Sequence, residues 1–155
     1  MEEYPNQASS RPLSGEDLDL KTMNAKFRFA KDIPFDQADW GRLGWISRPS
    51  ETQAQHITQI LVVLEGGFGH NFHYHPRQEE IVYVLDGEIE QWLETEKRTL
   101  KKGDAAFIGP GVVHGSFNIT GKAAQLMAVL SPPVTDAGYE IVEVSNEAPW
   151  NALRK

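Results

Sequence analysis

The sequence predicts an all-β domain, built as a β-sandwich or a barrel. The first observation is that short apolar runs recur at regular intervals, with turn residues such as Asp86-Gly87 between them. The second is that no segment keeps the period of about 3.6 residues that marks an amphipathic helix. The third is the length, because 155 residues fit one domain that buries its own core without cross-links.

The first residues differ in composition from the rest. Residues 1–20 are polar and rich in proline and serine, so we expect a flexible N-terminal arm, followed by a single β-barrel domain over residues 21–155. Residues 26–30 alternate between polar and apolar side chains and predict an edge strand. Trp40 and Trp45 come next, and we expect both to pack in the core or at an interface.

Each later apolar run predicts one strand, and Asp86-Gly87 favours a hairpin between two of them. We interpret residues 95–98 as a turn and residues 145–155 as a tail with one helical turn. The predicted strands are residues 56–64, 70–75, 80–85, 88–94, 104–108, 112–119, 123–130 and 139–144.

Composition excludes several classes of protein. The chain has no cysteine, which rules out a disulfide framework, a cysteine-based zinc site and an iron–sulfur cluster. The net charge of −7, with no basic stripe, argues against a nucleic-acid partner. No apolar run reaches the ~18–20 residues of a membrane span, and the polar N-terminus does not look like a signal peptide. We therefore expect a cytoplasmic protein with no membrane partner.

Two histidines one residue apart give the first functional signal. Side chains of a strand alternate between faces, so His73 and His75 lie on one face, as two ligands of one metal must. Pro76 ends that strand, and a hairpin would bring Glu80 of the next strand beside the two imidazoles. His114 follows the Gly-Pro-Gly turn of a later segment. Three imidazoles and one carboxylate suit a divalent transition metal and leave coordination positions open.

The spacing of these residues resembles that of the cupin superfamily. The first cupin motif is G-x5-H-x-H-x(3,4)-E-x6-G, and the second is G-x5-P-x-G-x2-H-x3-N. One position departs from the second motif, since Gly109 stands where the family has proline and Pro110 follows it. The matching residues are Gly67, His73, His75, Glu80 and Gly87 for the first motif and Gly103, Gly111, His114 and Asn118 for the second.

The resemblance implies a conical double-stranded β-helix, jelly-roll-like, with a metal in its lumen. It also implies a homodimer in many members, with exchanged N-terminal strands, and residues 27–30 offer apolar surface for one. The implied metal ligands are His73, His75, Glu80 and His114. Glu79 competes with Glu80, because the motif allows either spacing, but the six residues between Glu80 and Gly87 favour Glu80.

The remaining histidines, two glutamines and one tyrosine are further candidates for the site. We expect His56 to be solvated and His70, which has the opposite parity to His73, to face away unless the preceding glycines bend the strand. We expect Gln59 and Gln91 to be hydrogen-bonded core residues rather than substrate contacts. The sequence identifies no catalytic acid or base, and the candidates are Tyr83, Gln91 and His70. The predicted apolar lining is Val82, Val84, Ile89, Leu93, Phe72 or Tyr74, and Met127.

Three functions remain open at this point. The first, which we favour, is an oxygenase in which one Fe²⁺ per chain acts on a small organic substrate; Mn²⁺, Ni²⁺, Zn²⁺, Co²⁺ or Cu²⁺ are the other metals that suit this ligand set. The second is a metal-dependent lyase or isomerase without redox chemistry, acting on a sugar or keto acid. The third is a non-catalytic module that binds a metal or a small molecule. In each case, metal affinity should fall as the pH drops through the histidine range.

Overall fold

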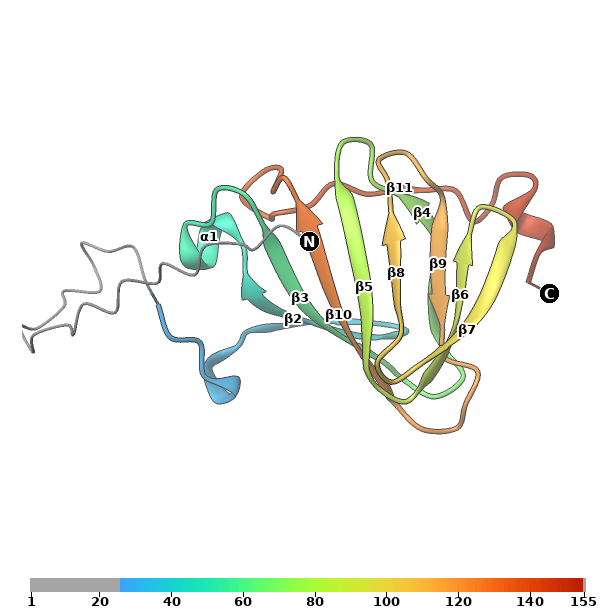
Figure 1. The fold of residues 1–155 in the computed structure, drawn as a ribbon, viewed down its shortest axis with the longest axis horizontal. Helices are drawn as coiled ribbons and strands as arrows, with labels where there is room; N and C mark the ends of the chain where they lie inside the picture. The colour runs from blue at the N-terminus through green and yellow to red at the C-terminus, as the bar shows by residue number, and fades with distance from the viewer. Residues whose placement is uncertain (1–25, 155) are drawn as a thin grey trace, which may run out of the picture.

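The chain folds into two antiparallel β-sheets, as the computed structural model of residues 26–154 shows (Figure 1). The larger sheet has six strands, in the order β1 (Phe35–Ala38), β2 (Gly41–Ser47), β3 (Thr58–Leu64), β10 (Ala124–Ser131), β5 (Glu79–Asp86) and β8 (Ala105–Ile108). The smaller has five, in the order β11 (Val142–Glu143), β4 (Gly69–Tyr74), β9 (His114–Phe117), β6 (Glu88–Leu93) and β7 (Glu96–Lys101). Three short helices complete the described part, η1 (Ala30–Asp32), α1 (Pro49–Thr52) and η2 (Trp150–Ala152), and none is long and apolar enough to cross a membrane.

Strands β3 to β6 alternate between the two sheets, and so do β8 to β10. This winding makes a double-stranded β-helix, and the predicted all-β fold class is confirmed. The observed strand order contradicts two hairpins that the sequence predicted. Strands β4 and β5 lie in different sheets, and so do β5 and β6, although Asp86-Gly87 does form a turn between the latter. Glu80 therefore reaches the histidines from the opposite sheet rather than from a neighbouring strand.

The main core fills the space between the sheets. Ile89 and Gln91 of β6 both point inward, as the alternation predicts, and are 0% and 3% exposed. On β10 the inward parity is the reverse of the expected one, so Met127 faces outward and its neighbours Leu126 and Ala128 are buried. The buried core residues are Trp45, Ile60, Val62, Leu64, Val82, Val84, Ile89, Ile108, Ala124, Leu126, Ala128 and Leu130.

A second cluster lies on the outer face of the smaller sheet, beneath the C-terminal segment. The rings of Phe72 and Trp92 meet edge to face at 5.6 Å between centroids, so Phe72 belongs to this cluster and not to the lumen. Tyr74, which shares its parity, also packs there. Both were alternatives for the lumen lining, and both are excluded because the lumen face of β4 carries the histidines. The buried members are Phe72, Trp92, Val113, Phe117 and Val144.

The N-terminal part of the described chain departs most from expectation. Residues 26–30 form no strand, and the edge strand is β1, paired with β2. Trp45 of β2 is core, 2% exposed, as predicted. Residues 96–98, interpreted as part of a turn, begin β7, whose exposed and charged side chains hide its strand character. The helical turn of the tail is confirmed as η2, and the predicted arm, residues 1–20, lies outside the described residues.

Candidate metal centre

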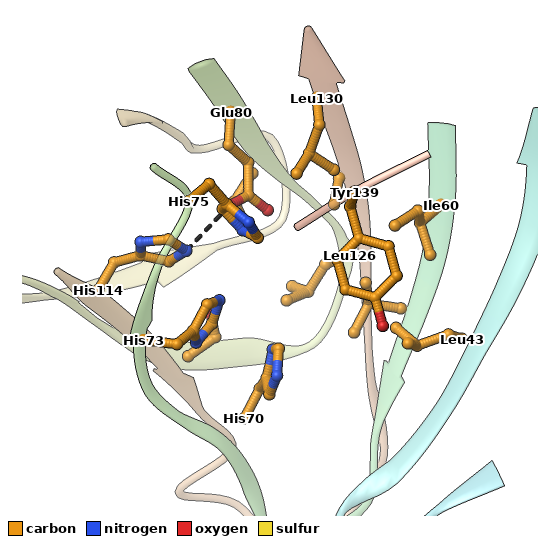
Figure 2. A pocket seen from close by; sticks show the side chains of 14 residues that line it. Leu43, Ile60, His70, His73, His75, Glu80, His114, Leu126, Leu130 and Tyr139 are labelled. Carbon is orange, nitrogen blue, oxygen red and sulfur yellow. Dashed lines mark ion pairs between the residues drawn. The ribbon is translucent and has the colours of Figure 1, made fainter. Parts of the chain in front are cut away.

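Backbone pairing brings the four predicted ligands together. Strands β4 and β9 are neighbours, and His73 stands directly opposite His114 in their register. His75 follows at the end of β4, on the same face as His73. Glu80, near the start of β5, projects from the facing sheet (Figure 2). All four side chains are buried, and one potential ligand atom of each lies within 4.8 Å of the others.

Each imidazole is held by a hydrogen bond on its outer nitrogen. Nδ1 of His73 donates to the carbonyl of Asn71 at 2.6 Å, and Nδ1 of His75 donates to that of Glu140 at 2.5 Å. Nδ1 of His114 likewise donates to the carbonyl of Val112 at 3.0 Å. A carbonyl oxygen only accepts, so Nδ1 must carry the proton in each ring. The three Nε2 atoms are then left as lone-pair donors, the tautomer that metal ligands need.

The close spacing of lone-pair donors at the centre of the cluster favours a bound cation. Oε2 of Glu80 lies 2.9 Å from Nε2 of His114 and 3.2 Å from Nε2 of His75. Oε2 of Glu80 and Nε2 of His114 are buried and have no hydrogen-bond partner of correct geometry among the described residues. Two lone pairs so close together are stable only when a proton or a metal ion lies between them. Nitrogen and oxygen donors without sulfur fit a divalent transition metal, so the residues fit the implied group.

The crowding of these side chains shifts their pKa values. Burial lowers the pKa of His73 well below its ordinary value, and His70 and His114 beside it act in the same direction. Burial opposes ionisation of Glu80, but the imidazoles of His114 and His75 beside it, when they carry a second proton, outweigh burial and hold the pKa of Glu80 well below its usual range. For His75, burial likewise opposes the charge, and the carboxylate of Glu80 prevails, so the pKa of His75 is raised. Glu80 therefore carries a negative charge at neutral pH.

Glu79 and Glu80 are clearly distinguished by their burial. Glu80 is 7% exposed and faces the three imidazoles, whereas Glu79 is exposed on the other face of β5. Only Glu80 can contribute to the cluster, as the spacing to Gly87 predicted. His56 is exposed, again as expected.

His70 lines the cavity, contrary to the expectation that it would face away. The pairing of β4 with β9 shifts between His70 and His73, which is the mark of a β-bulge. The extra residue lets both histidines face the lumen despite their opposite parity. The His70 ring stacks on Trp40 at 4.7 Å and lies 4.1 Å from the His73 ring, measured between centroids. Burial lowers the pKa of His70 to about 4.

The cluster opens into a small cavity of about 40 Å³ between the two sheets (Figure 2). Apolar side chains form most of its wall, and none of the described residues that line it is a lysine or an arginine. Apart from the four candidate ligands, its polar residues are His70, Ser116 and Tyr139. The apolar lining is Leu43, Ile60, Val62, Val82, Leu126, Ala128 and Leu130.

Comparison with known proteins decides the family. A family model described as "Cupin domain" matches residues 59–130. The chain is also 32% identical over 121 residues to the polyketide synthase CurC of Streptomyces cyaneus, covering 77% of this chain and 76% of that protein. The chain belongs to the cupin family.

Two further relatives of this cupin have informative names. It is 30% identical over 102 residues to the pectin degradation protein KdgF of Dickeya dadantii, covering 65% of this chain and 92% of that protein. It is 35% identical over 103 residues to quercetin 2,3-dioxygenase of Bacillus subtilis, covering 56% of this chain. The chain spans only 31% of that dioxygenase, and 64% of an Aquifex aeolicus protein to which it is 45% identical.

Solved structures agree on the fold. KdgF from Halomonas sp. superposes with a TM-score of 0.65 at 22% identity, covering 72% of this chain and 99% of that one. An oxalate decarboxylase from Lactobacillus farciminis gives 0.66 at 20% identity, covering 75% of this chain and 35% of that one. These likenesses establish the double-stranded β-helix and leave the reaction open.

The positions of the candidate acids and bases show which of them reaches the site of this cupin. Tyr83 is 42% exposed on the outer face of β5, away from the cavity. Gln91 is buried but does not line the cavity, and its Oε1 accepts a hydrogen bond from Ser116 at 2.6 Å, as expected of a core residue. Gln59 faces outward from β3 and is not core. Of the three candidates, only His70 reaches the site.

Two residues of the site, Tyr139 and Gln78, were not predicted from the sequence. Tyr139 reaches the cavity from the loop after β10, and Gln78 holds that loop in place. The Gln78 side chain donates to the carbonyls of Pro132 and Gly138, at 2.7 and 3.1 Å, and accepts from the backbone N–H of Glu140 at 2.9 Å. In the sequence Gln78 is one polar residue among several, and its partners lie 54 to 62 residues away, so spacing could not have found it.

Proposed function

We propose that this cupin is an iron-dependent oxygenase acting on a small, mostly apolar molecule that carries one anionic oxygen, such as a phenol or an enol. The observation that carries the proposal is the contrast inside one cavity. A buried cluster of three imidazoles and one carboxylate occupies one side, and apolar side chains form nearly all of the rest.

The charge balance of the cavity supports this substrate class. A divalent cation together with the carboxylate of Glu80 would leave one net positive charge in a buried, apolar space. One monoanionic oxygen on the substrate neutralises that charge, whereas a second anionic group would find no cationic side chain among the described lining residues. Burying such an unpaired charge is strongly unfavourable. A sugar would also leave most of its hydroxyls against aliphatic walls.

The residues have separable roles in this proposal. His73, His75, Glu80 and His114 would hold the iron, which when bound supplies the redox chemistry that combines dioxygen with the substrate. The side chains of Val82, Leu126 and their neighbours would orient the apolar body of the substrate and exclude water from the reacting atoms. The 35% identity to quercetin 2,3-dioxygenase, whose name specifies an aromatic polyphenol and dioxygen, supports the same class.

Oxygen uptake tests the proposal. Metal-free protein is reconstituted with Fe²⁺ without oxygen, then mixed with aerated buffer and a panel of phenols and enols. We expect substrate-dependent oxygen consumption by the iron-loaded protein, retained by Glu79→Gln and lost by His114→Ala. Tight binding of these compounds without consumption of oxygen would contradict the oxygenase and favour a binding module.

A lyase or isomerase is the second candidate, and one observation favours it. The 30% identity to KdgF extends over 92% of that protein, whose name places it in pectin degradation. A metal-dependent reaction without redox chemistry would need no dioxygen. Turnover of an unsaturated or keto sugar acid in an oxygen-free chamber, with zinc or nickel as well as iron, would establish this candidate in place of the first.

A further inference from the structure

We propose that His70 forms a hydrogen bond with a second polar group of the substrate, so that the site selects molecules with a hydroxyl next to the anionic oxygen. This inference rests on the proposed substrate class and assigns to His70 a role in specificity. It starts from the bulge in β4, which turns an additional imidazole into the cavity beside the ligand cluster.

The His70 ring is fixed in place without being a member of the cluster. It stacks on Trp40 at 4.7 Å and lies tilted against His73 at 4.1 Å, measured between centroids, so two aromatic rings hold it in place. The four atoms that approach within 4.8 Å of one another belong to other residues. Figure 2 shows the His70 ring beside His73, facing the space that the aliphatic side chains enclose.

His70 also differs from the three candidate ligands in its hydrogen bonding. Each of those imidazoles donates Nδ1–H to a backbone carbonyl, whereas no described residue makes a hydrogen bond with the His70 ring. The half-buried His70 ring therefore has hydrogen-bonding capacity that a ligand entering the cavity can use. A hydroxyl adjacent to the anionic oxygen is a suitable partner.

The other polar groups of the cavity are less suited to this role. The hydroxyl of Ser116 already donates to Gln91. The hydroxyl of Tyr139 points toward Leu43, on the far side of the cavity from His114 (Figure 2). His70 is therefore the lining residue closest to the cluster with a free hydrogen-bonding group in the described structure.

Catechol and phenol provide the probe, because they differ by the one adjacent hydroxyl. Calorimetric titration of zinc-loaded protein measures both affinities without any turnover. We expect wild type to prefer catechol over phenol, and His70→Phe, which keeps the stacked ring, to reduce that preference about three- to tenfold, the effect of one hydrogen bond. His70→Gln should restore part of the preference, and the exposed control His56→Phe should leave it unchanged. Zinc content measured alongside should stay the same in all variants.

Several outcomes would overturn the assignment. An unchanged catechol preference in His70→Phe would show that both catechol oxygens bind the metal without help from His70. Loss of the preference in Tyr139→Phe instead would assign the role to the tyrosine, and loss of zinc in His70→Phe would make His70 a ligand. Oxygen uptake is not part of this readout. A protein that shows the His70 effect but consumes no oxygen would refute the oxygenase and leave the specificity role standing.

Discussion

Glu80 is the residue on which the candidate site depends most. Its buried carboxylate faces two imidazole nitrogens at 2.9 and 3.2 Å, and it is the only carboxylate that lines the cavity among the described residues. Removing its charge would leave three neutral imidazoles and no group to offset a dication. The neighbouring Glu79 has the same chemistry and an exposed position, so the chain contains its own control.

Substitution of this carboxylate should weaken metal binding strongly. We expect Glu80→Gln to lower the affinity for Zn²⁺ or Fe²⁺ by more than about 100-fold, since outer-shell changes alone reach that range. The measurement is a competition titration against a chromophoric chelator. Glu79→Gln should match wild type, and equal affinity in the two variants would exclude Glu80 as a ligand.

Metal affinity should also depend on pH in a defined direction. The pKa of His75 is raised because, despite its burial, Glu80 stabilises the protonated ring, so a metal ion must displace that proton. Affinity should be constant above this pKa and fall at least tenfold per pH unit below it. An affinity that stays constant down to about pH 5 would show that the His75 proton does not compete. Titrations between pH 5 and about 8 cover this window.

The strand period predicted one part of the cluster, and the resemblance to the cupin motifs supplied the rest, including His114. His73 and His75 share a face because of that period, and the six residues to Gly87 separated Glu80 from Glu79. The same rule misplaced His70, because a bulge adds one residue and reverses the parity. Nothing in the local composition except the preceding glycines indicates that bulge.

At the scale of elements, the loop after β10 supports the site from outside. Residues 132–140 connect to His75 through the carbonyl of Glu140, and Gln78 fastens both ends of the loop. Gly111 adds a second support, since its N–H donates to the carbonyl of His75 at 2.9 Å. The turn of the second motif thus braces a ligand of the first, and the exchange of proline for Gly109 leaves this bond in place.

Loss of the Gln78 side chain should loosen this loop. Gln78→Ala would leave the carbonyl of Pro132 and the N–H of Glu140 without their partner, whereas the carbonyl of Gly138 would still accept from the hydroxyl of Thr58 at 2.7 Å. We expect about 2 kcal/mol less stability in urea unfolding and a fall of roughly tenfold in metal affinity, through His75. Gln55→Ala, at an exposed position, is the matched control. A stability loss with unchanged metal affinity would mean that the loop does not position the ligand.

Strand prediction succeeded where side chains alternate against a core and failed where they do not. β3, β5 and β10 carry apolar runs and were predicted within a few residues. β7 is almost wholly exposed, so its charged residues gave the pattern of a turn. The hairpins were misassigned because local turn residues do not reveal which sheet the next strand joins; that depends on contacts across the whole domain.

At the scale of the whole molecule, the homodimer remains a prediction. The expected strand at residues 27–30 is absent, yet the outer face of the larger sheet exposes apolar side chains of paired strands. Ile81 and Phe107 lie opposite each other in that register and are 46% and 62% exposed, beside Tyr83. Light scattering at micromolar concentration should give twice the mass of 17.4 kDa. A monomer under these conditions would contradict the prediction.

The metal content of the protein tests the central claim most directly. The protein is purified without chelators and without a nickel column, and its metals are measured by mass spectrometry. We predict close to one divalent transition metal per chain in wild type and in Glu79→Gln, with iron the main occupant, and almost none in Glu80→Gln. A wild-type protein that is folded but free of metal, and that takes up none when Fe²⁺ or Zn²⁺ is added, would contradict the account.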